Sequence, residues 1–241
     1  MRGYELKAGA RKIMSENAPK LFVISIIIVI VTALISELRF RMPGISDAYM
    51  QFLQKVASGE MPGFALLFSN LRPAGVALSL LLWLLSPVID VGYMSYCLKL
   101  TRGQTGGYRD ILDGFLFFGK IIIIFLITRI LVILWLLLLI IPGIIAAYRY
   151  RQAFYILLDA PEKGVLQCIR ESKQLMAGNK LDLFLLDLSF LGWIFADYAV
   201  MLLFILVSLP FSLPIVSIFL TPYLGLTYAA YYDHLINRLV V

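Results

Sequence analysis

The sequence predicts an all-α protein: a polytopic membrane bundle of six transmembrane helices. Its hydrophobic content is 61% and its mean hydropathy is +0.89, whereas soluble domains average about 45–50% apolar residues. Long uncharged runs recur: residues 21–36 read LFVISIIIVIVTALIS, and residues 121–141 contain Arg129 as their single charged residue. About 20 apolar residues cross the ~30 Å hydrocarbon layer of a bilayer. Backbone polar groups must be satisfied internally there, so these runs are expected to be helices.

The remaining spans follow from the same apolar pattern. We expect them at residues 21–38, 74–99, 120–141, 142–158, 183–208 and 214–233. The third and fourth spans are separated by Pro142-Gly143, which predicts a tight hairpin, because one uninterrupted helix would be too long for a bilayer. A short turn at 208–214 separates the last two. Residues 1–241 are thus predicted to form a single transmembrane domain.

The distribution of basic residues predicts the orientation. With the N-terminus inside, sixteen of the 21 Lys and Arg residues are cytoplasmic, and four lie in one outer loop, residues 39–72. Cytoplasmic loops of membrane proteins are enriched in Lys and Arg, so both termini are expected in the cytoplasm. The first apolar run is longer than a usual signal core, and we therefore expect a retained helix rather than a cleaved secretory signal.

The outer loop 39–72 is the one sizeable segment outside the predicted spans. Ser46 is positioned to cap a helix that continues to about Val56 and ends at Gly59. We interpret this helix as an amphipathic cap over the bundle. A lid or a partner-binding surface is the alternative.

Two stretches of the chain resemble each other at an offset of 162 residues. Residues 11–17, followed by Leu21-Phe22, match residues 173–179, followed by Leu183-Phe184. Both stretches are amphipathic at helical spacing and carry basic residues on the polar face, as helices lying on an anionic leaflet do. Residues 108–115 form a weaker third copy. The pattern predicts three units, each an interfacial helix followed by a hairpin, with coincidence as the alternative.

These amphipathic stretches supply the predicted contacts with lipid. The partners expected are the bilayer and the anionic headgroups of its inner leaflet, with each basic residue contributing about 1 kcal/mol of attraction. The net charge of +6 is explained by this bias, so nucleic acid is not an expected partner. The basic residues assigned to the lipid surface are Lys7, Arg11, Lys12, Lys163, Arg170 and Lys173.

Several motifs in the C-terminal half are similar to those of a known family. They are Ser172–Lys180, Leu188–Trp193, Ile141–Ile144, Pro222-Tyr223 and Tyr231-Tyr232. With them the chain resembles the bacterial integral membrane family catalogued as domain of unknown function nine-seventy-five. The resemblance is specific from about residue 140 to 235. It implies six helices in a bacterial cytoplasmic membrane, and it implies no activity.

Two parts of the chain depart from that family's pattern. The loop 39–72 carries no family motif, and the turn with Pro210 and Pro214 differs from the glycine-rich turn that the family leads us to expect.

The sequence argues against an enzyme. His234 is the single histidine, which excludes a two-histidine metal site within one chain, and neither a GxSxG nor a GxxxxGK[ST] motif occurs. We therefore assign no catalytic, metal-binding or cofactor-binding residue and expect no cofactor. His234 beside Asp233 is interpreted as a solvated helix end.

Ionisable residues inside the predicted spans are the remaining candidates for a polar site. They are Asp90, Arg129, Asp187 and Asp197. Such residues are costly in a bilayer and either mark a functional path or pair to fix helix packing, and both interpretations stay open. Arg129 and Asp90 are expected at a similar depth of about 14 Å. We therefore predict that Arg129 contacts Asp90, or failing that Asp187.

Two functions remain open at this point. The first is a non-catalytic membrane accessory protein with a scaffold, immunity or envelope-stress role. The alternative is a small transporter or lipid-handling protein with a polar site around Arg129 and the intramembrane aspartates. Pro87 and Gly92, as predicted helix breakers near Asp90, favour the alternative, since broken helices often flank transport sites.

Overall fold

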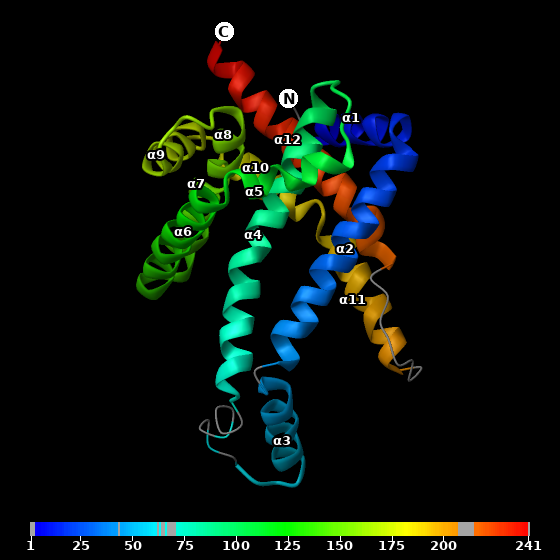
Figure 1. Ribbon diagram of the computed structural model, residues 1–241, viewed down its shortest axis with the longest axis vertical. Helices are drawn as coiled ribbons and strands as arrows, with labels where there is room; N and C mark the ends of the chain where they lie inside the picture. The colour runs from blue at the N-terminus through cyan, green and yellow to red at the C-terminus, as the bar shows by residue number, and fades with distance from the viewer. Residues whose placement is uncertain are drawn as a thin grey trace. The chain divides into compact units, whose positions relative to one another are not determined.

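The computed structural model of the chain is all-helical over the residues it describes (Figure 1), which are 3–42, 44–61, 63, 66, 71–206 and 215–240. Helices account for 85%, and these residues include no strand, so the all-α part of the prediction is confirmed. The chain divides into two compact units, Ile30–Pro87 and a larger one formed by Met1–Val29 with Val88–Val241.

The helices follow one another with short connections. In chain order they are α1 (Gly3–Glu16), α2 (Ala18–Arg41), α3 (Ile45–Ala57), α4 (Pro73–Thr101), the 3₁₀ turn η2 (Tyr108–Leu112), α5 (Asp113–Leu116), α6 (Phe118–Leu138), α7 (Ile140–Tyr150), α8 (Ala153–Asp159), α9 (Val165–Leu175), α10 (Lys180–Leu188), α11 (Leu191–Leu206) and α12 (Ile215–Val240).

Among the residues that the structure describes, four segments are long and apolar enough to cross a membrane. They are Ala18–Arg41, Pro73–Thr101, Phe118–Leu138 and Lys180–Val200, and they coincide with the first, second, third and fifth predicted spans. The predicted fourth span, 142–158, is divided between α7 and α8. The predicted sixth span lies within α12, while the turn at 208–214, with Pro210 and Pro214, lies outside the described residues.

The larger unit packs helices from both ends of the chain against one another. In Figure 1, α1 lies against α12, and α6 runs back along α7 as a hairpin. Leu139, whose backbone is extended, forms the turn between α6 and α7, three residues before the predicted turn at Pro142-Gly143, which the structure places within the first turn of α7. Leu21 and Ile24 of α2, Ile121 and Ile124 of α6, and Leu226 of α12 are fully buried in its core.

Helix α4 corrects one expectation from the sequence. Pro87 and Gly92 do not break it, because α4 continues without interruption from Pro73 to Thr101. Gly92 instead allows the backbone of η2 to approach α4 closely, because a Cβ on Gly92 would collide with the backbone carbonyl of Ile111. In the same way, a Cβ on Gly114 would collide with the carbonyl of Val88. The absence of side chains at both glycines therefore lets η2 and α5 lie directly on α4.

The two stretches paired by sequence share a local geometry. Asn17 follows α1 and donates its side-chain amide to the carbonyl of Ile13 at 3.1 Å. Asn179 follows α9 and donates in the same way to Leu175 at 3.0 Å. Each asparagine thus adds a side-chain hydrogen bond to a carbonyl near the end of the preceding helix, before the chain enters an apolar helix.

The smaller unit, Ile30–Pro87, contains α3. This helix matches the one predicted in the outer loop, and Gly59, with φ of +83°, follows its end. It begins after Gly44, and the side chain of Ser46, the predicted cap, lies outside the described residues. Asp47 pairs with Arg72 at 3.3 Å on an exposed surface, where such a pair contributes only about 0–1 kcal/mol.

We predict that Gly92→Ala destabilises the protein. The added methyl group must push η2 away from α4, and overpacking of this kind costs about 1–3 kcal/mol. Gly192→Ala in α11 is the matched control, since a Cβ there meets nothing within 4 Å. Thermal unfolding in detergent should show a lower midpoint for the first variant alone. Equal midpoints would contradict the close packing of η2 on α4.

Candidate functional site

A carboxylate on α10 forms the centre of the first polar cluster. Asp187 accepts hydrogen bonds from Tyr148 of α7 and from Tyr228 of α12, both at 2.8 Å. It also pairs with Arg151, which follows α7 and whose guanidinium lies 4.3 Å from the centre of the Tyr228 ring. One half-buried aspartate thereby joins three helices and has three donors for its two oxygens.

A second cluster surrounds Arg102, directly after α4. Its guanidinium donates to Asp159 at the end of α8 at 2.6 and 2.9 Å, and to Asp233 of α12 at 3.0 and 2.7 Å. Tyr232 donates to Asp159 at 2.9 Å. The hydrogen bonds to Asp159, opposed by burial and assisted by those to Asp233, raise the pKa of Arg102. The cation therefore holds three chain segments together at any physiological pH.

A third cluster joins α4 to η2 and α5. Lys99 donates to Asp110 at 2.6 Å and to Asp113 at 2.7 Å, and Ser95 donates to Asp113 at 2.7 Å. This contact is available because Gly92 and Gly114 bring the two segments together. In all three clusters the charged groups are bonded to partners from the same chain, one cation to one carboxylate at Asp187 and one cation to two carboxylates at Arg102 and Lys99, and these bonds fasten helices to one another.

The structure gives two of the four residues of the predicted intramembrane site partners of their own. Asp187 pairs with Arg151 rather than with Arg129, and Asp197 of α11 accepts a hydrogen bond from Ser217 of α12 at 2.6 Å. Arg129 is exposed on α6, with its guanidinium 5.1 Å from the centre of the Phe125 ring.

The predicted ion pair of Arg129 is therefore wrong. Its charge reaches Asp90 electrostatically, but in the part of the chain that the structure describes no ion pair within 4 Å joins Arg129 to Asp90 or to Asp187. For Asp187, the missing pair with Arg129 is explained by the break between α7 and α8. It places Arg151 beside α10, where this second arginine occupies the carboxylate.

Sequence reasoning missed Arg151 and its two tyrosines. A signal for the tyrosines was present, because Tyr148 and Tyr228 each follow a proline by six residues, as Tyr93 does. The spacing does not reveal that two of them converge on one aspartate, since that depends on how α7, α10 and α12 pack.

The basic residues assigned to the lipid surface differ in their surroundings. Lys7 donates to the carbonyl of Ser189 at 3.0 Å and lies 3.9 Å from the centre of the Phe190 ring. Lys163 pairs with Glu171 at 2.7 Å. Arg11, Lys12, Arg170 and Lys173 are exposed, the first donating to Tyr223 at 3.4 Å and the second lying 3.9 Å from Glu16.

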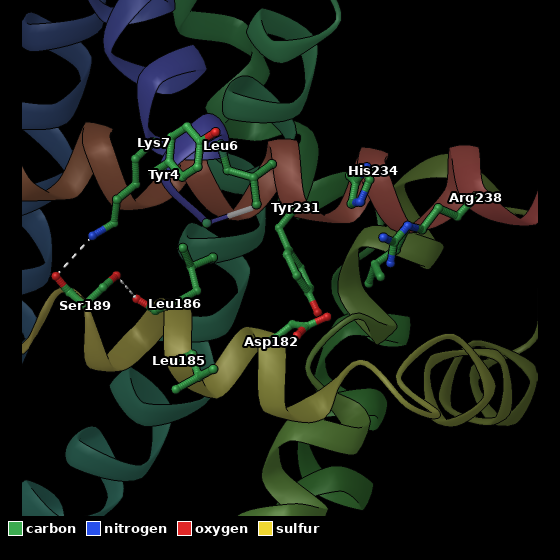
Figure 2. A pocket seen from close by; sticks show the side chains of 12 residues that line it. Tyr4, Leu6, Lys7, Asp182, Leu185, Leu186, Ser189, Tyr231, His234 and Arg238 are labelled. Carbon is green, nitrogen blue, oxygen red and sulfur yellow. Dashed lines mark hydrogen bonds between the residues drawn. The ribbon is translucent and has the colours of Figure 1, made fainter. Parts of the chain in front are cut away.

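A pocket of about 480 Å³ opens between α1, α10 and α12 (Figure 2). Figure 2 shows Lys7 on one side, reaching Ser189, and His234 with Arg238 along α12 on the other. Asp182 of α10 lies below Tyr231. The described residues contain no group of three His, Cys, Asp or Glu side chains that could hold a metal ion.

The Arg151–Asp187 pair can be tested with a double-mutant cycle. Arg151→Gln or Asp187→Asn alone should destabilise the protein, because each leaves a half-buried group with fewer partners. The double variant should recover part of the loss, with a coupling of about 1–3 kcal/mol. Unfolding midpoints in detergent measure this, and Arg129→Gln, which removes an exposed arginine, should be near neutral. Additive losses at Arg151 and Asp187 would contradict a direct pair.

Comparison with known proteins concerns this same region. Residues 128–239 match the family described as "Protein of unknown function (DUF975)", and the resemblance found in the sequence is confirmed over them. The match covers the whole Asp187 cluster, Asp182 and the α12 side of the pocket. No curated protein and no solved structure matches the chain.

Proposed function

We propose that the protein is a non-catalytic accessory protein of a bacterial cytoplasmic membrane, acting as a scaffold or in an immunity or envelope-stress role. The observation that carries this proposal is the internal pairing of its polar clusters. Asp187, Arg102 and Lys99 are each bonded to side chains of the same chain, and these bonds join helix ends.

Helix lengths support six crossings with both termini cytoplasmic. Residues 140–159, from the start of α7 to the end of α8, would reach about 30 Å at ~1.5 Å per residue. The 26 residues of α12 are likewise long enough for a crossing. Arg151 falls at the break between α7 and α8, and its pairing with Asp187 would reduce the cost of a cation within a span.

Matching contacts support the repeated plan of helix and hairpin. Ser25 and Asp187 are separated by the same 162 residues as the sequence repeat. Ser25 bonds Tyr93 of α4 at 2.9 Å, and Asp187 bonds Tyr228 of α12 at 2.8 Å. Each therefore links the first helix of one repeat to the helix that returns.

The burial pattern extends this correspondence to α6. Leu21 and Ile24 precede Ser25, Leu183 and Leu186 precede Asp187, and Ile121 and Ile124 precede Phe125. All these aliphatic residues are buried, at spacings of three and four that define one helix face. The third unit carries an apolar Phe125 in place of the polar residue, which fits its weaker sequence match.

Topology can be tested by labelling single cysteines. Gln54→Cys should react with a membrane-impermeant maleimide in intact cells, whereas Thr105→Cys and Lys173→Cys should react only after the membrane is opened. The background protein carries Cys97→Ala and Cys168→Ala; both native cysteines are buried, and this background should give no label. Labelling of Gln54→Cys from the cytoplasmic side alone would overturn the six-span arrangement.

Flux measurements separate the accessory role from the transporter alternative. Purified protein in proteoliposomes should pass protons or monovalent ions no faster than empty liposomes do. The transporter alternative rests on the electrostatic interaction between Arg129 and Asp90. A flux that Arg129→Gln abolishes, with the unfolding midpoint unchanged, would replace the accessory proposal with transport.

A further inference from the structure

The pocket between α1, α10 and α12 combines an apolar base with separated charges. Leu6 of α1, Leu186 of α10 and Leu235 of α12 line it and are almost fully buried, with exposed fractions of 2–4%. Its volume of about 480 Å³ lies within the ~300–1,000 Å³ of typical small-molecule sites. The base can therefore accept the apolar part of an amphiphile.

Side chains of opposite charge line the pocket without pairing with each other. Asp182 and Arg238 both line it and both are exposed. Among the described residues neither takes part in an ion pair within 4 Å, although both act electrostatically on Tyr231 between them. Lys7 adds a second cation, which also donates to Ser189. An acid and a base held apart in this way can each bind one charge of a zwitterion.

His234 contributes little charge to the pocket. Burial, together with the neighbouring Arg238, lowers its pKa below the ordinary value, so the ring is neutral at physiological pH. The charged groups open to a ligand are thus Arg238 and Asp182 at one side of the pocket and Lys7 at the other. A purely anionic headgroup would be repelled by the aspartate, whereas a headgroup carrying an amine as well as a phosphate would be attracted to Asp182 and Arg238 alike.

We infer that this pocket binds the headgroup of an aminophospholipid, with its phosphate at Arg238 and its ammonium group at Asp182. Arginine is suited to phosphate oxygens, and a carboxylate is suited to an ammonium ion. The lipid source rests on the proposed function, in which α1 and the cytoplasmic ends of α10 and α12 lie at headgroup level.

The test uses the full chain in detergent and counts bound lipid by native mass spectrometry. The probes are dihexanoyl-phosphatidylethanolamine, dihexanoyl-phosphatidylglycerol and inorganic phosphate. Arg238→Gln should weaken binding of both lipids at least tenfold. Asp182→Asn should weaken binding of the ethanolamine lipid at least tenfold and leave binding of the glycerol lipid unchanged or tighter. Arg238 is preferred to Lys7 as a target because Lys7 also bonds Ser189 within the fold.

Arg109→Gln is the matched control, since it removes an exposed arginine of η2 that lies outside the pocket and outside the set assigned to the lipid surface. Its lipid affinities should equal those of the unaltered chain, and all variants should keep the same unfolding midpoint. The inference would be overturned if Asp182→Asn changed the affinities for the two lipids by the same factor, relative to the unaltered chain. Displacement of the ethanolamine lipid by inorganic phosphate at equal concentration would also overturn it, because the ligand would then be a free phosphate. These assays use soluble lipids, so their failure is distinguishable from a failure of the topology.

Discussion

The cost of placing a carboxylate in apolar surroundings governs the packing of the C-terminal half. Asp187 lies on a helix rich in leucine, where an unpaired charge would be strongly unfavourable. Its three donors come from different parts of the chain: Tyr148 and Arg151 from the end of α7, and Tyr228 from α12. The relative positions of α7, α10 and α12 are therefore set by the need to satisfy one residue.

The same constraint explains why charge gathers at helix ends in this protein. Arg102 joins the end of α4 to α8 and α12, and Lys99 joins α4 to η2 and α5. Apolar helices alone would pack against one another with little preference for register, because aliphatic contacts are not directional. Hydrogen-bonded ion pairs add direction and so select one arrangement. Gly92 and Gly114 provide the close approach that the Lys99 cluster requires.

The hydrogen bonding in these clusters bears on function, because it decides which charged groups remain available to a substrate. Groups already bonded to one another have little capacity left for a substrate, which is the basis of the accessory proposal. The pocket at α1, α10 and α12 differs, because Asp182 and Arg238 face it without an ion pair in the described part of the chain. A lipid site there would deepen the role of a membrane scaffold without requiring catalysis.

The sequence by itself determined the all-helical class, four of the apolar segments that could cross a membrane, and the family resemblance, and it placed a hairpin turn three residues away from its position at Leu139. These follow from local composition and from the reach of a helix, which need no knowledge of neighbours. Tertiary structure decided which arginine pairs with Asp187 and kept α4 intact through Pro87 and Gly92. The depth of Arg129 along its helix suggested it as the partner of an intramembrane aspartate. Pairing also depends, however, on the rotation of each helix and on the break at Arg151. Those are fixed only when distant segments pack together.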